Sequence, residues 1–304
     1  MHQACLGVMR KLLVTWMRGK GRLLNVRMSS THIQRVSDAL IGFSGSITRD
    51  FQRKPRHLKY IDRWKATELR QFLLYTGKFC LKDILRSDLY EHFMAFSIAL
   101  CILVSPSLAP LHHAYAEELL VYFNEKGRDL YGQEFLVYNV HSLVHLADEA
   151  REFGHLDACA AFPFENYLQY VKKLVRSGRQ PIVQIVKRLH EIDMHPVVTL
   201  TNKPTIETAS PNNCYILSEH SCCEVEEKSN EKGDDGNLLY LCRVYRRTSS
   251  HFTTPCDSKL IGVQQVHNRN AQMMLISERQ LNTKAMKFNI GINAYVFMSL
   301  LHCI

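Results

Sequence analysis

The sequence predicts an α+β fold in which a mostly helical domain is followed by a small β-rich domain. Up to about residue 195 apolar residues recur at helical spacing, as at Leu119, Leu120 and Phe123. Over residues 194–213 prolines, threonines and asparagines replace that pattern, and short apolar runs separated by turns follow. We therefore expect a helical domain at residues 1–195 and a β-rich domain at residues 210–304, joined between Asp193 and Asn213.

The individual elements follow from these periodicities. Helical spacing predicts helices at residues 3–17, 31–42, 65–75, 88–104, 109–126, 133–151, 164–176 and 181–192. Short apolar runs predict strands at residues 214–217, 238–245, 260–266, 273–276 and 295–301. The polar stretch 228–237 is expected to be a loop between two of these strands.

An uncharged stretch at residues 93–111 raises the question of a membrane span. Pro106 and Pro110 interrupt it, and charged or histidine residues flank it closely on both sides. We expect a buried core helix that ends at the prolines, and no association with a membrane.

Charge and cysteine content narrow the class of protein. The formal net charge is +9, and residues 1–37 carry seven basic side chains and no acidic one. Such an N-terminus is compatible with a mitochondrial presequence, although a nuclear or cytoplasmic location is the preferred interpretation. Ten cysteines are too few for a disulfide scaffold in a chain of 304 residues, so reduced intracellular thiols are expected.

The segment 157–177 (DACAAFPFENYLQYVKKLVRS) carries the clearest chemical signal. Pro163 places Glu165 at the start of a predicted basic helix, where a carboxylate is suited to a metal ion. Lys172, Lys173 and Arg176 follow on that helix and would meet a phosphate backbone. The alternative is that Glu165 is only an N-terminal acid favoured by the helix dipole, and spacing alone does not decide between the two.

A second basic stretch lies at residues 49–70, where eight basic residues are interleaved with Phe51, Tyr60 and Trp64. Phosphate contacts with aromatic packing would suit a DNA-binding surface. The alternative is a solvated face with Trp64 anchored in the core.

His141 and His145 stand one helical turn apart and superficially resemble a metal-binding pair. No glutamate follows the first histidine, so the pair is not the His-Glu-x-x-His motif of metalloproteases. A third ligand for an independent metallohydrolase is not evident, and a core or surface pair is the preferred interpretation.

Several long strings resemble the C-terminal half of CACTA-type, cut-and-paste DNA transposases and of transposon-derived proteins. They are MHQACLGVMRKLL at residues 1–13, RKPRHLKYIDRWKATELRQFLLYTG at residues 53–77, and LYGQEFLVYNVHSLVHLADEAREFGHLDACAAFPFENYLQYVKKLVRS at residues 130–177. The similarity continues weakly in SPNNCYIL, CRVYRR, PCDSKLIGV and SLLHC, so it extends over nearly the whole chain.

The resemblance implies a truncated ribonuclease H-like core with a helical insertion. In that family two aspartates and a glutamate hold two divalent ions, Mg²⁺ in a full-length relative. Met1-His2 looks like the end of the family's Asp-x-x-His motif, and His2 is then a remnant of it. Both catalytic aspartates would lie upstream, and Glu165 matches the third carboxylate.

The resulting interpretation is a transposase-derived fragment that is inactive alone, because one carboxylate cannot hold two Mg²⁺ ions. It would hold metal at Glu165 only if upstream aspartates were supplied, and no cofactor is expected for the chain as it stands. The expected partners are double-stranded DNA, bound weakly and without sequence preference, and a full-length transposase or another protein. The alternative is a host interaction module that binds protein partners without DNA. The expected DNA contacts are Arg53, Lys54, Arg56, Arg63, Lys65, Lys172, Lys173 and Arg176.

Overall fold

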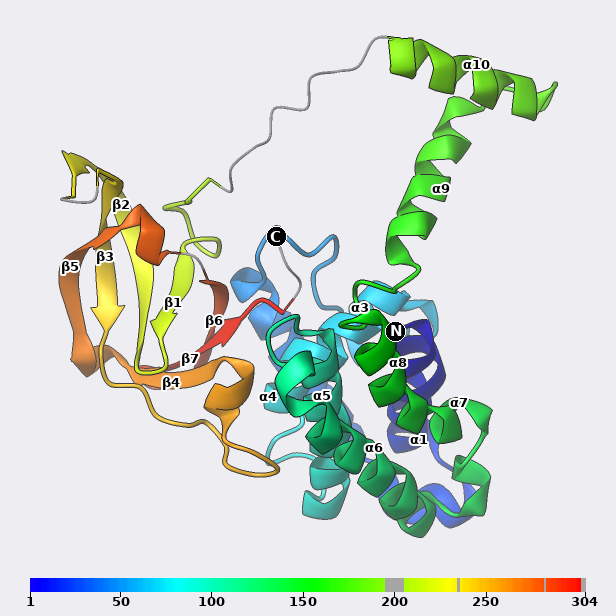
Figure 1. The fold of residues 1–304 in the computed structure, drawn as a ribbon. Helices are drawn as coiled ribbons and strands as arrows, with labels where there is room; N and C mark the ends of the chain where they lie inside the picture. Colours follow the sequence, from blue (N-terminus) through cyan, green and yellow to red (C-terminus); the bar gives the residue numbers. More distant parts are fainter. Residues whose placement is uncertain (195–204, 234–235, 282, 302–304) are drawn as a thin grey trace. The chain divides into compact units, whose positions relative to one another are not determined.

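The computed structural model describes residues 1–194, 205–233, 236–281 and 283–301 (Figure 1). In these residues the helices longer than one turn precede residue 195, and an antiparallel sheet follows residue 213. The predicted α+β class, with a helical part followed by a strand-rich part, is confirmed.

The helical part combines α-helices with short 3₁₀ and π segments. The α-helices are α1 (Arg10–Arg18), α2 (Ser30–Gly42), α3 (Ala66–Gln71), α4 (Gly77–Cys80), α5 (Ser87–Val104), α6 (Ala109–Tyr131), α7 (Tyr138–His141), α8 (Leu146–Phe153), α9 (Phe162–Leu174) and α10 (Pro181–Met194). The short segments before residue 195 are η1 (Gln3–Met9), η2 (Gly21–Val26), η3 (Phe43–Ser46), η4 (Leu58–Arg63), η5 (Phe72–Thr76), η6 (Gln133–Phe135) and η7 (Ser142–His145).

Helix α5 is apolar on nearly all sides and is buried from Leu89 to Val104 apart from two positions near its start. A helix of this kind must be covered all round. It ends at Ser105 because the ring of Pro106 cannot continue the backbone pattern. It is long and apolar enough to cross a membrane, but 78% of its apolar window is buried inside the protein. The expected core helix is therefore confirmed.

Helix α6 runs beside α5 and covers one side of it (Figure 1). Its apolar stripe, which includes Leu119, Leu120 and Phe123, is buried against α5 as the spacing predicted. The helix begins with Pro110 in its first turn, where the missing N–H costs nothing, and it bends at His112.

The single helix predicted over residues 133–151 is wrong. The chain forms η6, α7, η7 and α8 there, with an extended residue at Val137. The break turns the Phe135 ring toward α6 at Gly127, where a Cβ atom would approach that ring to 2.6 Å. Only glycine leaves room for this contact, so aromatic packing overrides helical periodicity here.

Seven strands form one antiparallel sheet in the order β4-β7-β6-β1-β2-β3-β5. They are β1 (Cys214–Ser218), β2 (Ser221–Lys232), β3 (Leu238–Tyr245), β4 (Val263–His267), β5 (Ala271–Ser277), β6 (Thr283–Gly291) and β7 (Ala294–Ser299). The 3₁₀ segments η8 (Ser258–Ile261), η9 (Asn268–Asn270) and η10 (Glu278–Gln280) lie between them.

Two strands were not predicted. Residues 228–232, expected to begin a polar loop, extend β2 instead, with Lys232 opposite Leu238 of β3. Their side chains are polar because this end of the hairpin is mostly exposed. Strand β6 was missed because two neighbouring residues, Ala285 and Met286, are both buried and break the alternation that marks a half-buried strand.

One half of the sheet shares its core with the helices. The Phe288 ring of β6 lies 4.9 Å from the Phe43 ring and 5.1 Å from the Phe79 ring, measured between centroids. The backbone N–H of Leu301 donates to the phenol oxygen of Tyr75 at 2.9 Å. The helical part up to residue 157 and the sheet are therefore one packed body.

The chain divides into two compact units, and their bounds differ from those of the predicted domains. One unit comprises Met1–Asp157 with Ile206–Cys303, and the other is Ala158–Thr205, which holds α9 and α10. The predicted boundary between Asp193 and Asn213 falls largely on residues 195–204, which lie outside the described residues.

A buried hydrogen-bond chain fixes His92 in its neutral form. The Trp16 indole N–H donates to the Tyr131 hydroxyl at 3.1 Å, and that hydroxyl faces His92 Nδ1 at 3.4 Å. His92 Nε2 lies 2.9 Å from the carbonyl oxygen of Phe123, to which it donates. Burial lowers the pKa of His92 to about 4 from the ordinary value of 6.5.

We predict that the protein loses stability as the pH falls from about 6.5 to about 4. In this window the unfolded chain binds a proton at His92 and the folded chain does not, so protonation favours unfolding, by up to about 3 kcal/mol. Thermal unfolding followed by circular dichroism should show the decline. His92→Gln should flatten it, whereas His190→Gln, at an exposed position of α10, should leave it unchanged. An equal decline in the His92 variant would contradict this assignment.

Candidate nucleic-acid interface and a polar pocket on the sheet

The turn between α9 and α10 is held by the side chain of Gln184. Its amide nitrogen donates to the carbonyl oxygens of Ser177, at 3.0 Å, and of Arg179, at 2.6 Å. Its amide oxygen accepts the backbone N–H of Arg176 at 3.0 Å. One side chain thus closes the turn and sets the angle between the two helices.

Basic side chains gather on this two-helix unit. Lys172 and Lys173 occupy the last turn of α9, where the helix dipole favours cations, and Arg176 follows directly. All three are exposed, as are Arg179 and Lys187. Between residues 162 and 194 six basic residues stand against three acidic ones. The unit therefore has an excess of positive charge on its surface.

The two residues that the resemblance singles out lie in different compact units. Glu165 lies in the first turn of α9, as predicted, and its side chain is outside the described part of the chain. His2 precedes η1 and is half-buried. The structure therefore leaves the assigned roles of both residues as predictions.

Two of the five basic residues expected to contact DNA in the 49–70 stretch have partners within the protein. The Arg56 guanidinium holds the buried carboxylate of Glu68 through two hydrogen bonds, of 2.5 and 2.9 Å. The Lys54 ammonium donates to the carbonyl oxygen of Ile47. Lys54 is nevertheless exposed, as are the other three, Arg53, Arg63 and Lys65.

Two aromatic residues of this stretch, Trp64 and Tyr60, also differ in whether they are buried or exposed. Trp64 is only 4% exposed and lies in the core, as the alternative interpretation expected. Tyr60 is 42% exposed, with the Lys59 ammonium 4.9 Å from its ring centroid. The stretch is therefore a partly structural surface, and Arg53, Lys54, Arg63 and Lys65 are the members of the expected set that are exposed on it.

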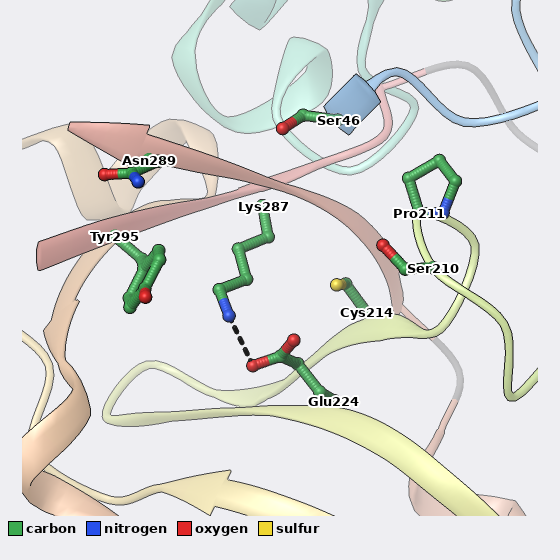
Figure 2. A pocket seen from close by; sticks show the side chains of 8 residues that line it. All are labelled: Ser46, Ser210, Pro211, Cys214, Glu224, Lys287, Asn289 and Tyr295. Atoms are coloured by element: carbon green, nitrogen blue, oxygen red, sulfur yellow. Dashed lines mark hydrogen bonds and ion pairs between the residues drawn. The ribbon is translucent and has the colours of Figure 1, made fainter. Parts of the chain in front are cut away.

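A polar pocket on the sheet was not anticipated from the sequence (Figure 2). It has a volume of about 200 Å³ and is lined by Ser46, Ser210, Pro211, Cys214, Glu224, Lys287, Asn289 and Tyr295. Its centre is the ion pair between Lys287 Nζ of β6 and Glu224 Oε1 of β2, at 2.6 Å. Strand β1 lies between these two strands, so the lysine side chain reaches across it.

Two tyrosines contact this ion pair without adding a charge to it. The Tyr245 hydroxyl donates to the same Glu224 oxygen at 2.6 Å, and the Lys287 ammonium lies 3.9 Å from the Tyr295 ring centroid. Burial and the Glu224 carboxylate raise the pKa of Tyr245, so its phenol remains protonated and donates. Burial raises the pKa of Cys214 to about 12, so its thiol is not an activated nucleophile. The arrangement is suited to bracing three strands.

No metal site assembles from the side chains that the structure describes: no group of three or more histidine, cysteine, aspartate or glutamate residues comes together among them. The rings of His141 and His145 face each other edge to face at 6.4 Å, in α7 and η7. This pair therefore lacks a described third ligand. Eight of the described cysteines are free thiols: Cys5, Cys80, Cys101, Cys214, Cys222, Cys223, Cys242 and Cys256.

We predict a coupling free energy of about 1–2 kcal/mol between Glu224 and Lys287, because each side chain is at most 20% exposed. The measurement is a double-mutant cycle with Glu224→Gln and Lys287→Met, followed by urea unfolding. The matched control is the pair Arg243 and Glu226 on the same sheet, which is about 40% exposed and should couple by about 0.2–1 kcal/mol. Equal coupling free energies in the two pairs would show that the buried Glu224–Lys287 pair stabilises the sheet no more than an exposed pair does.

Comparison with known proteins adds one match. The model of a domain of unknown function (DUF8592) matches residues 182–300, which extend from α10 to the end of the sheet. No curated protein and no solved structure matches this chain. The matched stretch is less than half of the chain, and it includes the region where the sequence predicts a domain boundary.

Proposed function

We propose that this chain is a transposase-derived protein that binds DNA weakly and without sequence preference, and that it does not cut DNA alone. The observation that carries the proposal is the set of exposed basic side chains at the end of α9, Lys172, Lys173 and Arg176. Lys172 and Lys173 stand on the same helix as Glu165, the residue that the resemblance matches to a transposase carboxylate, and Arg176 follows the end of that helix.

The physical basis is counterion release. Lysine and arginine side chains that neutralise phosphates release condensed cations, so affinity depends on salt and not on base sequence. The structure contributes a fixed turn, because Gln184 ties Arg176 to the start of α10. The basic groups before and after this turn are thereby held in one arrangement that a phosphate backbone can follow.

The transposase resemblance also implies a ribonuclease H-like core with a helical insertion, and Mg²⁺ in a full-length relative. In our proposal the helical part up to residue 157 is that insertion and α9 is the last helix of the core. The side chains described in this chain do not assemble a set of acidic ligands for two metal ions. We therefore derive no metal-dependent step for this chain.

We predict that duplex DNA binding, measured by fluorescence anisotropy, weakens linearly on a log–log plot against salt, with a slope of about −0.9 per phosphate contact. Replacing Lys172, Lys173 and Arg176 by alanine should weaken binding to all sequences alike. The slope should become shallower by up to about 3.

The matched control replaces three exposed basic residues of the sheet region, Lys228, Lys232 and Arg279, by alanine. This variant loses the same charge and should bind DNA like the parent chain. If the two triple variants weaken binding equally, net charge and not α9 is responsible. Absence of any association at low salt would remove DNA as a partner of this surface.

We further predict no cleavage or strand transfer of DNA by this chain with Mg²⁺ or Mn²⁺, because the resemblance assigns it only one of three carboxylates. The assay is the conversion of supercoiled plasmid to nicked or linear product. Cleavage that Glu165→Gln abolishes would show that the chain assembles a complete site, and the proposal of an inactive chain would fail.

A second candidate function is an interaction module that binds a protein partner. It is favoured by apolar side chains on α9 and α10 that repeat at a four-residue spacing, Phe164 with Leu168 and Ile182 with Val186. Their side chains are between 60% and 73% exposed. This interpretation expects no salt-dependent association with DNA, so the anisotropy experiment separates the two functions.

A further inference from the structure

Ser177 lies in the turn between α9 and α10, outside both helices (Figure 1). Residues 176–180 are all exposed, and Val175 before them already has an extended backbone, with φ −86° and ψ 114°. The Ser177 hydroxyl oxygen accepts a hydrogen bond from the Gln184 amide at 3.1 Å, and this bond is itself exposed to solvent. An enzyme can therefore reach the hydroxyl group without entering the core of the protein.

Basic side chains stand on both sides of Ser177. Arg176 precedes it directly, Arg179 follows two positions later, and two lysines occupy the last turn of α9. The sequence has no acidic residue from position 166 to position 190. Protein kinases that act on basic segments hold them through acidic groups in their substrate clefts. Charge complementarity therefore favours a kinase of this class as the enzyme that acts on the turn.

A second serine with basic neighbours is Ser249, which follows Arg246 and Arg247 closely. The two serines differ in how their backbones are held. The backbone N–H of Ser249 donates to the carbonyl oxygen of Gln265 at 2.9 Å, and its carbonyl oxygen accepts the N–H of Gln265 at 2.8 Å. This bridge to β4 has to break before a kinase can take up the segment. The described hydrogen bonds of Ser177 run instead to the side chain of Gln184, so the structure favours Ser177.

We propose that Ser177 is a phosphorylation site and that its phosphate weakens the binding of DNA at the end of α9. A kinase directed to basic segments transfers the γ-phosphoryl group of ATP to Ser177 Oγ. The bond from phosphorus to the leaving oxygen of ADP breaks, the bond to Oγ forms, and the hydroxyl proton passes to the base of the kinase. The regulatory part of this inference rests on the proposed function, because it concerns the same basic surface.

The phosphate acts on DNA binding through its charge. A phosphoserine carries a charge of about −1.5 to −2 and has three strong acceptor oxygens. Arg176 is its direct neighbour in the chain and Arg179 is two residues away, so these guanidinium groups can bond to it in place of a DNA phosphate. Because about two positive charges are offset, the slope of log affinity against log salt becomes shallower by up to about 2.

The first measurement treats the intact protein with the catalytic domain of protein kinase C, Mg²⁺ and ATP, and digests it with a protease that cuts after glutamate. The resulting peptide 166–191 contains Ser177 as its single serine and has no threonine. It should gain one HPO₃ unit, which tandem mass spectrometry locates on Ser177. Ser177→Ala should remove this product and Ser249→Ala should retain it. Phosphate on Ser249 with none on Ser177, or no phosphate at all, would overturn the inference.

The second measurement compares kinase-treated and untreated protein in the DNA anisotropy titration. The phosphorylated parent chain should bind more weakly and with the shallower slope, and kinase-treated Ser177→Ala should bind like the untreated parent chain. The turn persists in this variant, because Gln184 still donates to the backbone carbonyl oxygens of positions 177 and 179. Equal binding before and after phosphorylation of Ser177 would overturn the inference and leave the proposed DNA binding intact. If the untreated chain does not bind DNA, the proposed function fails and the regulation fails with it, whatever the mass spectrum shows.

Discussion

The fold depends on the need to cover helix α5 on every side. Because almost no face of this helix is polar, α6, α8, η5 and the sheet-side segment η8 all pack around it. Polar groups that are buried next to α5 must find hydrogen-bond partners within the protein, because water does not reach them. His92 donates to a backbone carbonyl, and Ser97 donates to the carbonyl oxygen of Leu73. Lys78, the one lysine that is buried among the described residues, likewise donates to a backbone carbonyl, that of Leu74.

The sheet is held to the helices by charge as well as by aromatic packing. Lys284 of β6 contacts Asp50 at 2.9 Å and Glu207 at 3.5 Å, and Arg49 contacts Glu207 at 3.1 Å. Burial alone would raise the pKa of Asp50, but the Lys284 ammonium and the nearby Thr48 hydroxyl lower it overall. Asp50 therefore stabilises the junction while it is ionised, and this contribution is lost as the pH falls below its ordinary range.

The spacing of apolar residues predicts most of this fold, because a helix or strand with a long apolar stripe buries that face regardless of which element packs against it. It predicted α5 and β3 nearly to the residue, and it predicted the start of α6 but ended that helix five residues early. It failed at Phe135, where a glycine on a neighbouring helix decides the backbone path, and at β6, whose burial comes from contact with the helices. The pair Glu224 and Lys287 was unpredictable for a related reason: 63 positions separate them, and only the strand order brings them together. The basic end of α9 could be predicted because its residues are local in sequence.

The strand order has a consequence for the solution behaviour of the protein. Strand β5 stands at one end of the sheet, and its seven residues include no charged residue and no proline. Met273 and Leu275 are about half exposed on it. An edge strand of this kind presents unpaired backbone groups that another chain can extend, and lysine or proline usually guards against such growth. Self-association would thus begin at β5, in spite of the net charge of +9 on the chain as a whole.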